Sequence, residues 1–254
     1  MNVGLQLYTT RRLGGLQQQL LMAQQVGYRH VETVGFHDMA VKDVVDSCAA
    51  FQLKVTSAHF DWPEFETRFQ DILWFLEASG CQVVVMPWLP QSDRPSTRAG
   101  WGQLIRTMRI WAKDLADIGV RFAYHNHDYE LRPLDGTTAL DLILKEPLIY
   151  WQPDVGWLAH SGEDVGFWLR RYPTKITSIH AKDIAPGAGR GDEVWRDLGD
   201  GVLDWADIIT SLEACENVDL FVEHDESSDY HRTLTSGFTV LNRALGARNC
   251  AVVS

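Results

Sequence analysis

Eight short apolar stretches alternate with stretches of helical spacing along this chain, without a linker or a shift in composition between them. The apolar stretches are hydrophobic at consecutive positions, as in Val83–Met86, which is typical of parallel strands buried on both faces. Eight strand–helix units in 254 residues predict an α/β fold, a single (β/α)8 TIM barrel. We therefore expect residues 1–254 to form one domain, with 246–254 as a C-terminal tail.

A doubly wound open sheet is the competing α/β fold. It usually has fewer strand–helix units and a glycine-rich nucleotide-binding turn after its first strand. Here Tyr8–Arg12, with the sequence Tyr-Thr-Thr-Arg-Arg, occupies that place, so the barrel is the better interpretation. The predicted strands are Val3–Tyr8, His30–Gly35, Leu53–His59, Val83–Met86, Phe122–His125, Leu148–Asp154, Ile176–Lys182 and Val218–Glu223. The predicted helices are Leu16–Val26, Met39–Phe51, Glu64–Ser79, Leu104–Ile118, Thr137–Lys145, Val165–Tyr172, Trp205–Ala214 and Thr233–Leu245.

Polar side chains collect where the predicted strands end. Phe122–Glu130 passes from apolar and aromatic residues into polar ones, and the alternation of a strand places His125 and His127 on the same face. In a parallel barrel every strand ends at one rim, so reactive groups gather there. The residues expected at this rim are Glu32, His59, His125, Asp154, His180, Lys182 and Glu223.

Three of these residues have the chemistry of a metal site. Asp154, His180 and Glu223 together offer two carboxylates and one imidazole. This mixture suits one divalent ion such as Mn²⁺, Co²⁺, Mg²⁺ or Zn²⁺. The carboxylates would repel each other without a cation, which favours a bound metal over a chance grouping.

Seven stretches of the chain together resemble the sugar phosphate isomerase/epimerase superfamily, whose fold is the xylose isomerase-like TIM barrel. The resemblance covers essentially the whole chain, and it implies a divalent metal held by Glu, Asp, His and Glu at four strand ends. The family's Asp falls on Asp154, its His on His180 and its last Glu on Glu223. The stretches that carry the resemblance are Gly4–Tyr8, Gly27–Glu32, Tyr124–Glu130, Asp154–Trp157, His180–Asp183, Leu198–Trp205 and Val222–Glu223.

The chain departs from the family pattern at two positions. His125 replaces the family's first Glu, so it is the candidate fourth ligand or a group that faces the substrate. Trp157 stands where many sugar epimerases carry a His. The sequence Tyr-His-Asn-His at 124–127 is closer to the inosose dehydratase-like branch, in which water is eliminated.

The resemblance implies an isomerase or epimerase that abstracts a proton next to the metal-bound carbonyl of a small sugar or polyol ketone. The alternative is a dehydratase or lyase that acts on keto sugars or inososes by β-elimination. We expect His125, His127, Glu223 and Lys182 to be catalytic. The ordinary histidine pKa of about 6.5 suits proton transfer near neutral pH. Lys182 is expected to hold an anionic oxygen, to donate a proton, or to pair with a rim carboxylate.

Other rim residues are expected to bind the substrate. Glu32 and His59 are interpreted as hydrogen-bonding groups, and Trp88 and Trp157 as pocket walls, with core packing as the alternative for the two tryptophans. Arg196 could form a local anion site with Lys182 and Arg190.

The charge of the chain limits its partners. With 23 Lys and Arg against 34 Asp and Glu, the formal net charge is −11, which disfavours nucleic acid and anionic membranes. An endonuclease IV-like nuclease is therefore a weaker reading than a sugar enzyme, and a non-catalytic sugar-binding barrel is a third. The first strand follows Met1 directly and the four cysteines lack a C-x-x-C spacing, so we expect a cytoplasmic protein. Whether copies associate into a homo-oligomer stays open.

Overall fold

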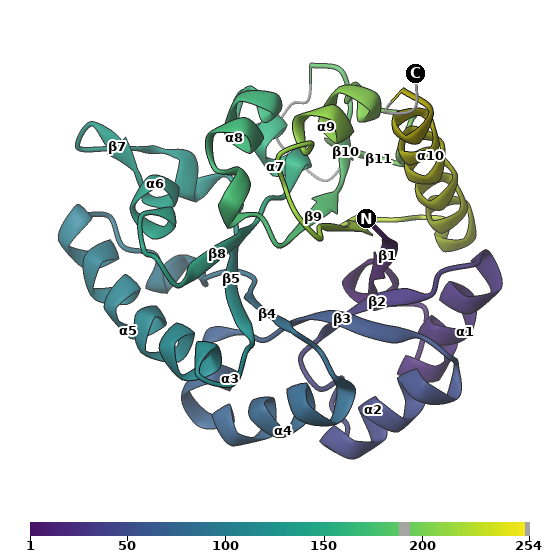
Figure 1. Cartoon of the computed structure of the whole chain (residues 1–254), viewed down its shortest axis with the longest axis horizontal. Helices are drawn as coiled ribbons and strands as arrows, with labels where there is room; N and C mark the ends of the chain where they lie inside the picture. Colours follow the sequence, from purple (N-terminus) through teal and green to yellow (C-terminus); the bar gives the residue numbers. More distant parts are fainter. Residues whose placement is uncertain (188–193, 252–254) are drawn as a thin grey trace.

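The computed structural model, which describes residues 1–187 and 194–251, confirms the predicted barrel (Figure 1). The strands follow the order β8-β5-β4-β3-β2-β1-β12-β9, and every pairing between neighbours is parallel. Parallel bridges from Trp151 to Ile176 and from Asp154 to His180 close the ring between β8 and β9. The barrel strands are β1 (Val3–Gln6), β2 (His30–Val34), β3 (Lys54–His59), β4 (Val83–Met86), β5 (Arg121–His125), β8 (Ile149–Gln152), β9 (Ser178–Ala181) and β12 (Asp219–Val222).

The helices form an outer layer around the strands (Figure 1). Helix α1 shows why, because Leu16, Leu20 and Ala23 recur on one face and are buried against the sheet. It ends at Gly27, whose φ of 116° is left-handed and favours glycine. The helices are α1 (Leu16–Val26), α2 (Val41–Ala50), α3 (Trp62–Thr67), α4 (Phe69–Ser79), α5 (Arg98–Ala116), α6 (Ala139–Leu144), α7 (Val155–His160), α8 (Val165–Arg171), α9 (Trp205–Ser211) and α10 (Tyr230–Ala251).

Several helices begin or end elsewhere than predicted, and side chains that cap them explain some of the differences. Thr97 accepts a hydrogen bond from the Gly100 amide, so α5 begins six residues before Leu104. Helix α7 was not predicted; it begins at Val155, and the side chain of Asp154 caps it. Helix α10 extends into the predicted tail and includes residues 246–251, whereas 252–254 lie outside the described residues.

In the described part of the chain, two short antiparallel hairpins lie outside the barrel sheet, and one of them lies near the carboxyl ends of the barrel strands. The strands β6 (Pro133–Leu134) and β7 (Thr137–Thr138) form the first hairpin. The strands β10 (Asp183–Ile184) and β11 (Trp195–Arg196) form the second, directly after β9. None of the helices in the described part of the chain combines the length and the apolar character that crossing a membrane requires.

Asp183 fixes the segment between β11 and α9 against the barrel. Its buried carboxylate accepts hydrogen bonds from the amides of Ile184, Gly199 and Leu203, at 2.9, 3.1 and 3.1 Å, and from Trp205 Nε1 at 3.1 Å. A side chain in place of Gly201 would collide with this carboxylate, since an added Cβ would lie 2.1 Å from Asp183 Oδ1. One acidic side chain therefore orders this part of the rim.

We predict that Asp183→Ala lowers the free energy of unfolding by about 3 kcal/mol, because it leaves several buried N–H donors without an acceptor. Urea denaturation followed by circular dichroism measures this change. Asp46→Ala is the matched control, since Asp46 is exposed and pairs with Lys42 at the surface. Its loss is expected to cost less than about 0.5 kcal/mol. Equal costs for the two variants would contradict the role assigned to Asp183.

Candidate metal centre and substrate pocket

Four strand ends bring the predicted ligand residues together. His125 ends β5, Asp154 lies just after β8, His180 is in β9 and Glu223 follows β12. All four side chains are buried, and one ligand atom from each lies within 4.8 Å of the others. The barrel therefore gathers His, Asp, His and Glu into one group that is suited to a metal ion.

Local hydrogen bonds hold Asp154 in place. Its Oδ1 accepts from the Trp157 amide at 2.9 Å as the cap of α7, and its own amide donates to Asn126 Oδ1 at 3.2 Å. The other carboxylate oxygen, Oδ2, lies 2.9 Å from Lys182 Nζ and 3.8 Å from His125 Nε2. The sequence motif contained Asn126, but its part in fixing Asp154 was not predicted.

Both ring nitrogens of His180 contact carboxylates. Nδ1 lies 2.8 Å from Glu223 Oε2, and Nε2 is paired with Glu32 Oε1. Burial alone would lower the pKa of His180, but the charges of Glu223 and Glu32 outweigh burial and raise the pKa to about 10.

Glu32 lies beneath the pocket and does not line it. Its side chain is fully buried, and its oxygens accept hydrogen bonds from Gln6 Nε2 and Gln152 Nε2, both at 2.6 Å. His59 Nε2 is 3.1 Å from the same carboxylate that pairs with His180. The expectation that Glu32 binds the substrate is therefore corrected, because its oxygens are already occupied by protein groups and orient two imidazoles.

Lys182 is a buried cation of the site, as is His180. Its Nζ lies 2.9 Å from Asp154 Oδ2 and 2.8 Å from both Glu223 Oε2 and Asp225 Oδ1. Burial opposes the charge, but the three carboxylates outweigh it and hold the pKa of Lys182 well above its usual value. The pairing with rim carboxylates, one of the roles expected for Lys182, is present in the structure.

His125 and His127 are neutral at neutral pH. Burial is the main reason that the pKa of His125 falls well below its usual value and that the pKa of His127 falls to about 3. Both pKa values lie below the ordinary histidine value of about 6.5. In the described residues the buried Nδ1 atoms of both rings have no hydrogen-bond partner. An unpartnered neutral imidazole is a suitable metal ligand or hydrogen-bonding group.

Glu130 fixes the backbone of His127 through a hydrogen bond. It accepts a hydrogen bond from the His127 amide at 2.8 Å and another from the Tyr124 hydroxyl at 2.6 Å. Burial raises the pKa of Glu130 to about 7. The residue lay within the predicted motif, yet its inward orientation could not be deduced from spacing.

A cavity of about 450 Å³ opens above these residues. Trp88 and Trp157 line it as expected, together with Trp195, which was not predicted. Asp225 also lines it, and its position two residues after Glu223 was the sequence signal for it. Other expected site residues on the cavity wall are His59, His125, His127, Lys182 and Glu223.

Arg196 is not part of this cavity wall. It lies on β11, which pairs with β10 away from the barrel strands, and its guanidinium donates to the Trp195 carbonyl at 2.8 Å. Arg190, its expected neighbour in an anion site, lies outside the described residues.

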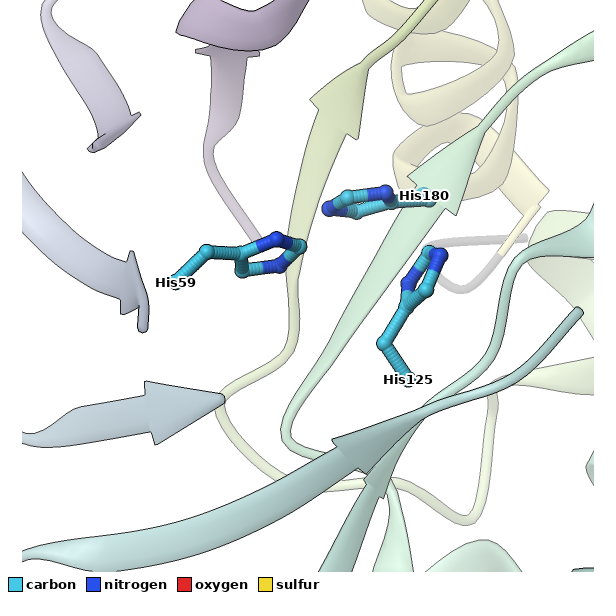
Figure 2. A group of neighbouring side chains, drawn as sticks. All are labelled: His59, His125 and His180. Carbon is cyan, nitrogen blue, oxygen red and sulfur yellow. The ribbon is translucent and has the colours of Figure 1, made fainter. Parts of the chain in front are cut away.

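A second group of three histidines, His59, His125 and His180, also has ligand atoms within 4.8 Å of one another (Figure 2). The rings of His59 and His180 are nearly parallel, with an interplanar angle of 12° and centroids 5.1 Å apart. Lone pairs in two parallel planes do not converge well on one ion. His59 Nε2 is also engaged by Gln152 Oε1 at 2.7 Å. The group with two carboxylates therefore fits a divalent ion better.

Comparisons with known proteins agree with the barrel fold. The family described as xylose isomerase-like TIM barrel matches residues 20–232. An inosose dehydratase from Mesomycoplasma hyopneumoniae (strain 7448) is 30% identical over 182 residues, which is 63% of this chain and 59% of the relative. The match thus spans less than two thirds of that enzyme.

Solved structures show the same fold at low identity. A sugar phosphate isomerase/epimerase from Parabacteroides distasonis ATCC 8503 superposes with a TM-score of 0.77 at 19% identity, covering 94% of this chain and 92% of the other. The IOLI protein, solved with a zinc atom bound, has a TM-score of 0.68 at 15% identity and covers 96% of each chain. At these identities the likeness establishes the fold alone.

We predict that Asp154→Ala and Glu223→Ala each weaken divalent-metal binding by at least about 10-fold, because each removes an anionic ligand. Elemental analysis after dialysis against Mn²⁺, Co²⁺ or Zn²⁺ measures the bound metal. His59→Ala is the control and is expected to keep its metal. A loss in His59→Ala as large as in Asp154→Ala would instead favour the three-histidine group.

Proposed function

Because the chain belongs to the xylose isomerase-like TIM barrel family, we propose that it is a metal-dependent enzyme that removes a proton next to the carbonyl of a small, unphosphorylated sugar or polyol ketone. The observation that carries this proposal is the buried group of His125, Asp154, His180 and Glu223 at the base of a tryptophan-lined cavity. A divalent ion held by these residues, whether Mn²⁺, Co²⁺, Mg²⁺ or Zn²⁺, would act as a Lewis acid that makes the C–H bond beside a carbonyl more acidic.

The cavity suits a neutral ring better than a phosphate ester. In the described part of the chain, Lys182 is the one lysine or arginine that lines it, and three carboxylates already engage the ammonium. Glu226 adds a further acidic group to the wall. Trp88 and Trp157 offer flat faces on which the C–H groups of a sugar or cyclic polyol pack.

The acidic groups of the cavity are on one side. Glu223, Asp225 and Glu226 all follow β12, whereas the facing wall holds His125 and His127. The imidazoles there have lowered pKa values. Lys182 and His180 also hold the pKa of Glu223 well below its usual value although burial opposes this, whereas burial raises the pKa of Asp225, so the carboxylate that accepts a proton most readily lies on the β12 side.

We infer from this asymmetry that the reaction is elimination of water. A carboxylate of the β12 side, Glu223 or Asp225, takes the proton from carbon. The C–O bond of the β-hydroxyl then breaks as the C=C bond forms, and the same carboxylic acid returns the proton to the leaving oxygen, which departs as water. One acid–base group suffices for these steps. The similarity to inosose dehydratases supports elimination over isomerisation or epimerisation.

The isomerase or epimerase expected first from the sequence is the second candidate. The observation in its favour is His127, which lines the opposite wall and could exchange a proton there. Epimerisation needs such a group because the proton returns on the other face of the carbon. Lys182 would stabilise the anionic oxygen in either reaction.

Incubation of neutral keto sugars and inososes with the Mn²⁺-loaded protein in D₂O distinguishes the two reactions. Elimination should give the ultraviolet absorbance of a conjugated enone and no deuterated epimer in the NMR spectrum. A deuterated epimer or isomer without enone would reverse our preference. Glu223→Gln is expected to lower kcat by at least about 100-fold, because it removes a candidate proton acceptor and an anionic metal ligand. Phosphorylated analogues should react more slowly than neutral ones.

A further inference from the structure

We propose that Lys182 competes with the divalent cation for Asp154 and Glu223, and that Asp225 holds the ammonium group when the cation is bound. This inference rests on the metal-dependent function proposed above. It concerns how strongly the site binds its cation, which is a property of the neighbours of the ligands as well as of the ligands themselves.

The ammonium group contacts the same oxygens that are available to a metal ion. Asp154 Oδ1 is engaged by the amide of Trp157, so Oδ2 is the free ligand atom, and it lies 2.9 Å from Lys182 Nζ. Glu223 Oε2, the oxygen beside His180 Nδ1, lies 2.8 Å from the same nitrogen. An ion bound to either oxygen at about 2.1 Å would be within about 5 Å of the ammonium. Two positive charges at that distance in a buried site repel strongly.

The side chain of Lys182 cannot move out of the site to reduce this repulsion. Its side chain is only 2% exposed. Its stem is packed so closely against α7 that a Cβ added to Gly156 would lie 2.9 Å from Lys182 Cβ and Cγ. Its Nζ lies 5.6 and 4.9 Å from the ring centroids of Trp157 and Trp195. The stem is therefore fixed, and only the end of the side chain can shift.

Asp225 offers the ammonium a partner outside the ligand group. Its Oδ1 lies 2.8 Å from Lys182 Nζ, and its side chain is 20% exposed on the cavity wall. It is not one of the four grouped ligand residues. A small movement of the ammonium toward Asp225 would release Asp154 and Glu223 without leaving a buried charge unpaired.

Two substitutions with opposite expected effects test this arrangement. Lys182→Met keeps an unbranched side chain, one atom shorter, but removes its charge, and we expect at least tenfold tighter binding of Mn²⁺. Asp225→Asn removes the alternative partner, and we expect several-fold weaker binding. Mn²⁺ affinity is measured by electron paramagnetic resonance of the free ion, which is independent of turnover. Lys113→Met, at an exposed lysine paired with Asp117, is the control and should bind like the wild type.

The outcomes separate this inference from the proposed function. Unchanged or weaker binding by Lys182→Met would overturn the competition, and weaker binding would show that Lys182 helps to orient the ligands. Unchanged or tighter binding by Asp225→Asn would overturn the role of Asp225, and it can be read even if Lys182→Met does not fold. A folded wild-type protein that binds neither Mn²⁺ nor Co²⁺ nor Zn²⁺ would remove the metal site itself and the proposed function with it.

Discussion

The carboxyl end of this barrel depends on the pairing of buried charges of opposite sign. Glu32, Asp154, Glu223 and Asp225 bring four carboxylates into contact with the cationic groups of His180 and Lys182. Removing a carboxylate from water is costly unless a cation or several donors compensate it. Two cations against four carboxylates leave an excess of negative charge. Burial and this excess raise the pKa of Asp154 to about 7, even though Lys182 opposes the rise.

The sequence predicted the barrel well because strands buried on both faces leave a direct signature. Val83–Met86 was predicted with the bounds that β4 has. Helix ends were less accurate because they depend on capping contacts. The predicted helix Glu64–Ser79 is two helices, since the backbone leaves the helical region at Arg68, with φ of −128°. Helix α7 was not predicted because Asp154 was assigned to the end of a strand, whereas its side chain also caps a helix.

The sequence predicted which residues meet at the rim but not how deeply each is placed. His125, Asp154, His180 and Glu223 follow from the rule that parallel strands end at one face. Glu32 lies two residues before the end of β2, so its side chain points into the layer below the cavity. The pKa values of the histidines could not be predicted, because burial and neighbouring charges exist only in the folded chain.

The replacement of the family's first Glu by His125 connects the ligand group to Lys182 and Asp225. An imidazolium cannot bind a metal, so His180 would lose a proton when a divalent ion binds. Two ligand carboxylates and that ion then sum to zero charge, so the ammonium of Lys182 finds no surplus anion among the ligands. A third ligand carboxylate would have balanced it, but the structure has a neutral imidazole at that position. Asp225, 2.8 Å from Lys182 Nζ, supplies the missing negative charge outside the ligand group. The neutral His125 at the end of β5 thus explains why Asp225 lies beside Lys182 after β12. It also explains why the carboxylates of the cavity wall lie on the β12 side.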